Sequence, residues 1–373
     1  MSQGIHVADD SVKRESTDRF ACPSCGGNMS FDADTQTLAC PYCDNKIVIA
    51  GKEGDINEYD LESAVDEQAG DWGCEKRVIR CEGCGAQTVL DTAGVAQFCS
   101  FCGSSHIVKD EKSAGIAPES IIPFKISAKK AVECFSAWIK KRYFAPNALK
   151  TEHQTQRLTG VYIPCWTYDS DTYSTYTGEG GTYYYETVTD WVEENGKRKA
   201  VTRRVRKIRW WPASGTYSQY FDDVLINASK KIDETLMNKL EPFDLGDLVQ
   251  YKPEYLSGFL AERYTIGVKE GWEKAKDNIK GVIRNGVIEK INADEVRNLR
   301  INTSYQNVKY KHILIPVWIS AYKYRNKLYQ YMVNAQTGEV QGRAPVSPWK
   351  VAVAVIAALI VAGGGVFLWN YLK

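Results

Sequence analysis

The sequence lacks the signatures of the common enzyme classes. It contains no phosphate-binding GxxxxGK[ST] loop, no HExxH metalloprotease motif and no GxSxG nucleophile elbow. Only four histidines occur in 373 residues, and they form no evident acid–base constellation. An excess of one charge is also missing, since the net charge is +1. These absences favour a binding protein over an enzyme, and the overall charge selects no partner.

The N-terminal segment lacks the apolar core of roughly 7 to 15 residues that marks a secretory signal. We therefore expect residues 1–19 to be a flexible N-terminus. We also expect the body of the protein to lie in the cytoplasm, which is a reducing compartment.

One long hydrophobic run lies near the C-terminus. The stretch from Val351 to Leu368 carries no charge, and at about 1.5 Å per residue a helix of this length can cross a hydrocarbon core of roughly 30 Å. Trp349 and Trp369 flank it as interface anchors. The sequence thus predicts a transmembrane helix at 349–369, which would tail-anchor a single-pass protein in a bacterial cell membrane. Small residues recur every four positions, so that helix dimerisation, and with it a homo-oligomer, is an open alternative. These residues are Ala354, Ala358 and Ala362.

Eight of the eleven cysteines form two sets with identical spacing. Each set contains two C-x2-C pairs separated by fourteen residues, and the second set follows the first after 59 positions. This regularity indicates the internal duplication of a small unit. The first set is Cys22, Cys25, Cys40 and Cys43, and the second is Cys81, Cys84, Cys99 and Cys102.

This spacing is typical of zinc ribbons. Two C-x2-C turns brought together by a hairpin place four thiolates in a tetrahedron around Zn²⁺. The units at 20–50 and 79–110 are too short to bury a core, so a metal would supply their folding energy. A disulfide framework is the alternative, which a reducing compartment disfavours. With four cysteines in each site no position is open for water, and we predict two structural zinc ions and no catalytic one.

An acidic linker is expected between the ribbons, at 51–78. Nine acidic side chains and one lysine occur from Lys52 to Glu75, a composition typical of a solvated, self-repelling segment. Neither ribbon has a basic surplus, which argues against nucleic acid as their partner. Two of the remaining cysteines, Cys134 and Cys165, lie in apolar patterns and are expected to pack in the core.

The region 117–345 has the composition of an α+β body with antiparallel β-sheet and helices. One helix is expected from Ala128 to about Tyr143, and a helical stretch from Trp272 to Arg300 with interruptions at Gly281 and Gly286. The motif Ile-Pro-x-Trp occurs twice, at Ile163–Trp166 and at Ile315–Trp318, which favours two related halves. A glycine-rich segment at 178–181 is expected to form a turn between tyrosine-rich strands.

A long hairpin is predicted around Asn195–Gly196, a dipeptide that suits a type I′ turn. One arm bears four acidic residues and the other bears eight basic residues, so a basic surplus remains after cross-strand pairing. Three interpretations stay open: contact with anionic lipid, contact with nucleic acid, or a solvated face without a partner. The candidate contacts with an anionic surface are Arg203, Arg204, Arg206, Lys207 and Arg209.

The order of these features resembles the bacterial zinc-ribbon membrane proteins of the YdjG type, whose ribbons are of the TFIIB type. The resemblance covers essentially the whole chain and depends on the segments IIPFKI, GVYIPCWTYDSDTYSTYTG, ILIPVW and VNAQTGEV. It implies a role in a phage-shock-type envelope-stress system, helping to place phage shock protein A and a flotillin-like SPFH protein at the membrane. Only the eight cysteines are carried over as site residues.

We therefore expect a membrane-anchored cytosolic scaffold or adapter, not an enzyme, whose ribbons recruit protein partners. The alternative is a membrane-tethered nucleic-acid-binding protein associated with transcription or replication. The expected fold class is α+β, with two tandem zinc ribbons, a mixed body and one C-terminal transmembrane helix.

Overall fold

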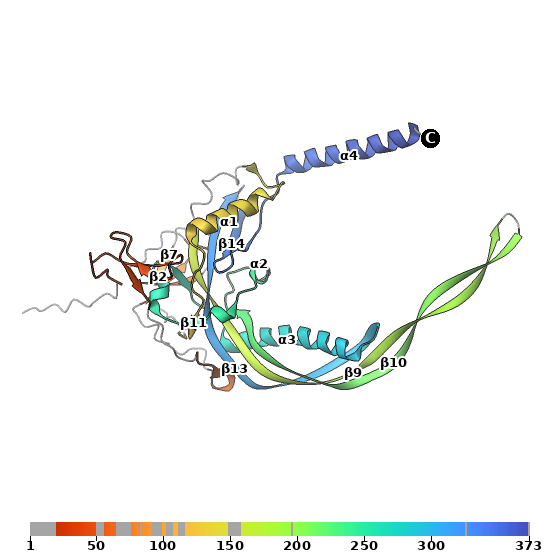
Figure 1. Ribbon diagram of the computed structural model, residues 1–373, viewed down its shortest axis with the longest axis horizontal. Helices are drawn as coiled ribbons and strands as arrows, with labels where there is room; N and C mark the ends of the chain where they lie inside the picture. Colours follow the sequence, from red (N-terminus) through yellow and green to blue (C-terminus); the bar gives the residue numbers. More distant parts are fainter. Residues whose placement is uncertain are drawn as a thin grey trace, which may run out of the picture.

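The computed structural model describes residues 20–49, 56–64, 76–82, 84, 86–91, 99–101, 107–110, 116–147, 158–194, 197–324 and 327–371. Within these residues the fold is α+β, as the sequence predicts. One large mixed sheet dominates it, and a separate small antiparallel sheet lies near the N-terminus. Figure 1 shows the large sheet as a curved band with helices beside it.

Three very long strands form the curved band. They are β9 (Thr159–Glu194), β10 (Lys197–Asn227) and β13 (Glu295–Tyr324). β9 lies between the other two and is antiparallel to both. Since β13 pairs with β9 only as far as Gly181, the outer parts of β9 and β10 continue as a two-stranded arm (Figure 1).

The glycine-rich segment is part of this continuous strand, and the predicted turn at 178–181 is wrong. Its glycines make room for aromatic rings from the neighbouring strand. A Cβ at Gly180 would lie 2.4 Å from the indole of Trp211, and one at Gly181 would lie 2.9 Å from that of Trp210. The glycines are therefore needed for close packing within β9, where the sequence pattern suggested a chain reversal.

Helix α3 (Val268–Ile291) lies inside the curve of the sheet (Figure 1). Its buried residues recur every three or four positions, as expected for a helix with one face on a core. The predicted interruptions at Gly281 and Gly286 do not occur, since the helix runs through both. Gly286 lets the helix approach Tyr217, whose hydroxyl would be 2.2 Å from an added Cβ. The helix ends where Asn292 adopts a left-handed conformation (φ 51°), and not at Arg300 as predicted.

The two Ile-Pro-x-Trp segments lie side by side in β9 and β13, with Ile163 opposite Ile315. Their tryptophans make equivalent hydrogen bonds. The indole N–H of Trp166 donates to the carbonyl of Ile266, and that of Trp318 donates to the carbonyl of Ile126, both at 2.8 Å. Each acceptor lies two residues before a helix, so both tryptophans fix a helix start onto the sheet.

The strands before these helices complete the same arrangement. β8 (Ser120–Ile121) runs parallel to β13, and β12 (Leu260–Glu262) runs parallel to β9. Helix α1 (Ala128–Lys140) follows β8 and ends three residues earlier than predicted. β8, which precedes α1, thus pairs with β13, the long strand after α3. β12, which precedes α3, pairs with β9, the long strand after α1. These crossed pairings join the two parts of the body.

Shorter elements close the body. Asn334 joins several of them, because its side chain donates to the carbonyls of Leu240 and Pro242 and accepts from two backbone N–H groups. The elements are α2 (Glu234–Leu240), the 3₁₀ helices η4 (Leu245–Asp247) and η5 (Pro253–Leu256), β11 (Val249–Gln250), β14 (Lys327–Asn334) and β15 (Val340–Gly342).

Helix α4 (Pro348–Tyr371) projects away from the body (Figure 1). Among the residues that the structure describes, no helix combines the length and apolarity that a bilayer span requires. This finding contradicts the predicted transmembrane helix at 349–369, and with it the predicted tail anchor and single-pass membrane location.

A buried histidine gives the core a predicted dependence on pH. His312 on β13 is 2% exposed, its ring lies 4.8 Å from that of Trp166, and its Nδ1 is 2.9 Å from the carbonyl oxygen of Ile116. Burial lowers the pKa of His312 from 6.5 to about 4, because a charged imidazolium loses its hydration there.

We expect acidification to destabilise the protein through this residue. Below pH 6.5 the unfolded chain takes up a proton at His312, whereas the folded chain does so only near pH 4. Between pH 6.5 and 5 the wild type should lose about 2 kcal/mol more than a His312→Gln variant. Urea unfolding of both proteins across this range measures the difference, and parallel stability curves would contradict the assignment.

Candidate metal centres

The first cysteine set comes together at one end of the small sheet. This sheet contains β1 (Ser30–Asp32), β2 (Thr37–Ala39) and β3 (Lys46–Val48), in that order. Four Sγ atoms from the loops around it lie within 4.8 Å of one another. The Sγ atoms of Cys22 and Cys43 are 3.4 Å apart, and those of Cys25 and Cys40 are 3.5 Å apart.

Backbone hydrogen bonds shape both C-x2-C turns of this set. The N–H of Gly26 donates to the carbonyl of Cys22 at 2.8 Å, and the N–H of Asp44 donates to that of Cys40 at 3.0 Å. Both donor residues adopt positive φ, 73° for Gly26 and 57° for Asp44. Each turn therefore closes through a residue in the left-handed region, which directs the two thiols of a pair to one side.

Crowding of the thiols separates their pKa values. Burial raises the pKa of Cys22, but backbone N–H groups of Cys25 and Ser24 stabilise the thiolate and lower the pKa to about 6. The backbone N–H of Asn45 lowers the pKa of Cys43, but hydrogen bonds with the Cys22 and Cys25 thiols outweigh this effect and raise that pKa to about 12. Because the Cys43 thiol stays protonated at neutral pH unless a nearby positive charge stabilises its thiolate, the set favours a cation that neutralises the thiolates.

The second set repeats this arrangement as far as it is described. The Sγ atoms of Cys81, Cys84 and Cys99 lie within 4.8 Å of one another, with 3.7 Å between Cys84 and Cys99. The N–H of Cys81 donates to the carbonyl of Ala86 at 2.9 Å. This bond is the counterpart, 59 positions later, of the 2.8 Å bond from Cys22 to Gly27. The predicted fourth ligand, Cys102, lies outside the described residues.

These spacings fit a metal ion. A tetrahedron with Zn–S distances near 2.3 Å has edges of about 3.8 Å between sulfur atoms. The observed separations of 3.4 to 3.7 Å approach this value, and the described cysteines are free thiols. The two groups can therefore each hold a metal ion.

The first ribbon is packed against the body. Phe31 in β1 contacts the ring of Tyr255 at 5.4 Å, and its N–H donates to the carbonyl of Ser257 at 3.0 Å. Cys22 and Cys40 belong to the same buried cluster as Phe31 and the body's central aromatic residues. The fold of the metal site and the core of the body are therefore physically connected.

The second ribbon is continuous with the main sheet. It contains β5 (Lys76–Cys81), β6 (Gln87–Asp91) and β7 (Ile107–Asp110). β6 pairs with β12 of the body, so the large sheet extends across the boundary between the two. The ribbons thus differ in how they are held, the first by side-chain packing with single hydrogen bonds and the second by β-strand pairing with the body.

The described part of the acidic linker pairs with the body, although most of its side chains are exposed. β4 (Tyr59–Asp60) pairs with β13, and Glu58 lies 3.2 Å from the buried Lys311. Lys311 also lies 2.7 Å from Asp223, one of three clustered carboxylates with Asp169 and Asp222. Because this lysine supplies a cation to the cluster, we interpret the cluster as an ion-pair network.

The basic residues singled out from the sequence lie on the two-stranded arm. Arg203 pairs with Asp190 at 2.5 Å and Lys207 pairs with Glu186. The other three guanidinium groups lie over tyrosine rings of β9, at 4.2 to 5.3 Å from the ring centroids. These pairs are Arg204 with Tyr185, Arg206 with Tyr183, and Arg209 with Tyr184. The predicted turn at Asn195–Gly196 lies outside the described residues.

The fold and the cysteine groups together define an α+β protein in which a long curved sheet is joined to one group of four cysteines and one group of three described cysteines, each able to hold a metal ion. No protein-family model matches the chain, and no solved structure matches it. The chain is similar to a Bacillus subtilis (strain 168) protein named "Uncharacterized protein YdjG", with 28% identity over 362 residues. The similarity covers 94% of this chain and 95% of the relative. It therefore supports the resemblance to YdjG itself, whereas the zinc-ribbon and phage-shock assignments receive no support from these comparisons.

Proposed function

We propose that this protein is an adapter that binds other proteins through zinc-stabilised ribbons. Each ribbon would hold one structural Zn²⁺ through four thiolates, which leaves no coordination position for a substrate. The zinc would fix the shape of a surface, and the curved body would hold the two ribbons in a defined relation.

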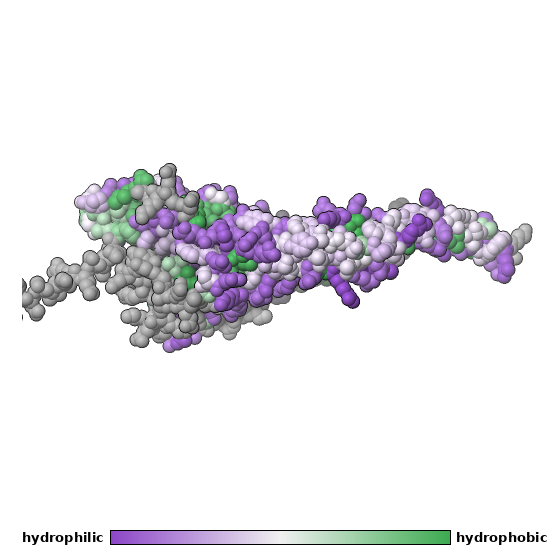
Figure 2. All heavy atoms as spheres, turned by 90° about the horizontal axis from the view of Figure 1, so that it is seen from below, coloured by the Kyte–Doolittle hydropathy of each residue, from purple (hydrophilic) through white to green (hydrophobic). Residues whose placement is uncertain are grey.

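The exposed edge of ribbon 1 carries the proposal. Within the described residues, β3 pairs with β2 on one side only, so its other edge offers backbone groups to a partner strand. Val48 in this strand is 75% exposed, and Tyr42 in the turn that precedes the strand is 77% exposed. Figure 2 shows hydrophobic surface at the end of the molecule opposite the tip of the arm. Such an edge suits the addition of an extended apolar segment from another protein.

The partners implied by the resemblance are a phage shock protein A-like protein and an SPFH or flotillin-like protein. The near-complete overlap with YdjG supports comparing the two proteins as wholes, ribbons and body together. We therefore propose the ribbon 1 edge as the docking surface for proteins of this kind in an envelope-stress system.

We expect a Tyr42→Ser/Val48→Lys variant to bind a purified phage shock protein A-like or SPFH partner at least about tenfold more weakly than the wild type. A charged lysine on the edge strand disfavours pairing with another strand, and the smaller serine removes an aromatic side chain that could anchor the partner. Biolayer interferometry on full-length protein measures this affinity, and zinc analysis checks that ribbon 1 keeps its metal. The matched control is Val282→Lys, which alters an exposed valine of α3 far from the ribbon.

Equal affinity of the wild type and the ribbon variant would contradict docking at this edge.

The second candidate function, nucleic-acid binding, is favoured by the arm, where Arg204 and Arg206 have no acidic partner among the described residues. A two-stranded arm is marginally stable alone and gains order from a partner. Salt-sensitive binding of an oligonucleotide, lost in Arg204→Ala/Arg206→Ala, would replace the adapter proposal by this one.

A further inference from the structure

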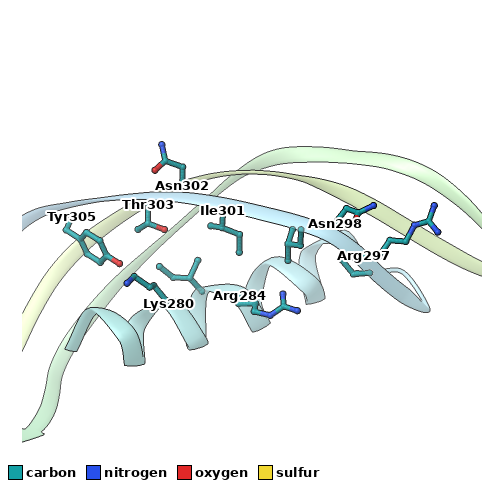
Figure 3. A pocket seen from close by; sticks show the side chains of 11 residues that line it. Lys280, Arg284, Arg297, Asn298, Ile301, Asn302, Thr303 and Tyr305 are labelled. Carbon is teal, nitrogen blue, oxygen red and sulfur yellow. The ribbon is translucent and has the colours of Figure 1, made fainter. Parts of the chain in front are cut away.

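A cavity of about 660 Å³ lies between α3 and β13, away from the cysteine sites (Figure 3). Helix α3 packs mainly on β9 and β10 and touches β13 only lightly. The inner side chains of β13 are therefore left partly uncovered beside the helix. The volume lies within the range of about 300 to 1,000 Å³ that is usual for small-molecule sites.

The floor of this cavity is apolar. Ile283 of α3 is fully buried at its base, and Val296, Leu299 and Ile301 of β13 are half-buried around it. In Figure 3 the side chain of Ile301 points from the strand toward the helix. A hydrocarbon chain would be removed from water on this floor, which is favourable by about 0.8 kcal/mol for each buried CH₂ group.

One end of the cavity holds a hydroxyl group without a hydrogen-bond partner, next to a lysine. The hydroxyl of Tyr305 is enclosed and has no hydrogen-bond partner within the described part of the chain. Burial raises the pKa of Tyr305, so its hydroxyl remains a donor at neutral pH. Figure 3 shows Lys280 extending from α3 toward this tyrosine. An enclosed donor without a partner costs free energy, which an anionic acceptor beside Lys280 would recover.

The rim adds positive charge. Arg297 is held by Glu179 at 2.5 Å and by the ring of Trp210 at 3.9 Å. Arg284 has no acidic partner among the residues described, and no carboxylate is found among those that line the cavity. The bond from Lys280 to Asp277, at 2.8 Å, is an exposed pair within one helix and competes weakly with a ligand.

The strand is shaped around the cavity by two irregularities. The pairing of β13 with β9 shifts register between Arg297 and Arg300, and again between Gln306 and Lys309. Within these shifts Asn298 and Asn307 adopt left-handed conformations, with φ of 53° and 51°. Bulges of this kind bend a strand and are frequent next to binding sites. The cavity therefore lies on the one segment of β13 that is bent at both ends.

We propose that this cavity binds a single-chain amphiphile with an anionic head group, of the fatty-acid or alkyl-phosphate class. The hydrocarbon chain lies along Ile283, Leu299 and Ile301. The head group accepts hydrogen bonds from the Tyr305 hydroxyl and the Lys280 ammonium group. This site is independent of the proposed adapter function, because it shares no residue with ribbon 1.

Isothermal titration of the full-length, metal-loaded protein tests the site. The probes are tetradecanoate, dodecyl phosphate and 1-tetradecanol, each below the concentration at which it aggregates. We expect one equivalent of an anionic probe to bind. The affinity of the alcohol should be lower by a factor of at least about ten. The stronger of the two anionic probes identifies the head group as a carboxylate or a phosphate.

Variants assign the binding to this cavity. Lys280→Met should weaken the anionic probe about tenfold and leave the alcohol unchanged, and Tyr305→Phe should weaken it about threefold to tenfold. The control Lys269→Met removes an exposed lysine of the same helix that does not line the cavity, and should have no effect. Ile301→Trp, which fills the cavity, should abolish binding of all three probes.

The proposal is overturned if neither anionic probe binds the wild type. It is also overturned if the alcohol binds as well as the anions, or if Lys280→Met and Tyr305→Phe bind like the wild type. Urea unfolding of each variant separates a lost site from a lost fold, and Tyr305→Phe keeps the ring that packs against Trp272 at 5.4 Å.

Discussion

Replacing Cys40 by serine should remove one of the two zinc equivalents that we propose, and it should destabilise the body as well as ribbon 1. Cys40 is 1% exposed and belongs to the same buried cluster as Phe31 and Phe124. Structural zinc contributes about 10–16 kcal/mol to the folding of isolated fingers, so a three-thiolate site loses most of its stabilising effect. Because ribbon 1 covers part of the body's core, its loosening exposes apolar surface there too.

We expect the free energy of unfolding to fall by at least about 4 kcal/mol in the Cys40→Ser protein. Metal analysis by mass spectrometry and thermal unfolding measure the two effects. The matched control is Cys134→Ser, a half-buried cysteine of α1 outside both sets, which should keep both zinc ions. Retention of two zinc equivalents by Cys40→Ser, or unchanged stability, would contradict the site and its connection to the core.

The second large effect is expected for Trp166→Ala. The indole is completely buried, and its rings lie 5.1 Å from Tyr264 and 6.0 Å from Tyr310. Truncating a buried tryptophan costs about 3–5 kcal/mol through the cavity that it leaves. The carbonyl of Ile266 also loses its hydrogen bond, which adds about 1–3 kcal/mol where water cannot replace the donor.

Urea unfolding checks this value through the shift in the transition midpoint at constant slope. Trp166→Phe keeps most of the volume but removes the donor, so it should fall between the wild type and the alanine variant. Trp191→Ala on the arm is the control, because that ring is largely exposed and its loss should cost less than about 0.5 kcal/mol. A Trp166→Ala protein within about 1 kcal/mol of the wild type would contradict the role of this residue as the anchor of α3.

Some features of the fold were predictable because they depend on local spacing. The 59-residue repeat of the cysteines is a linear pattern, and the structure brings the first four together in one group and the three described members of the second set in another. The sequence pattern predicted the start of α1 at Ala128 and its end to within three residues. The burial of Cys165 is likewise confirmed, since an uninterrupted apolar strand has few exposed positions.

Other predictions failed because a glycine accommodates a side chain that is distant in the sequence. Gly180 and Gly181 were interpreted as turn residues, but they accommodate rings from β10. Gly286 was interpreted as a helix interruption, but it accommodates Tyr217. In each case a glycine has two physical uses, conformational freedom and close approach, and only the contact decides between them.

The amphiphile site and the exposed edge of β3 were not singled out by any sequence motif. The cavity residues of β13 alternate like those of an ordinary strand, and their unusual feature is the incomplete cover that α3 gives them. Two asparagines near the bulges, Asn298 and Asn307, are a signal that could have marked the bends, because asparagine tolerates positive φ better than most residues.

The sequence by itself determined the two cysteine sites, the α+β class and the strongly basic strand of the arm, because each follows from residue type at short spacing. The tertiary structure decided that both ribbons are joined to the body, that the described part of the linker pairs with β13, and that β9 continues through its glycines. It also placed Tyr305 and Lys280 beside one apolar cavity. These outcomes depend on contacts between residues far apart in the chain, and burial and hydrogen bonding across such distances are settled only when the elements pack together.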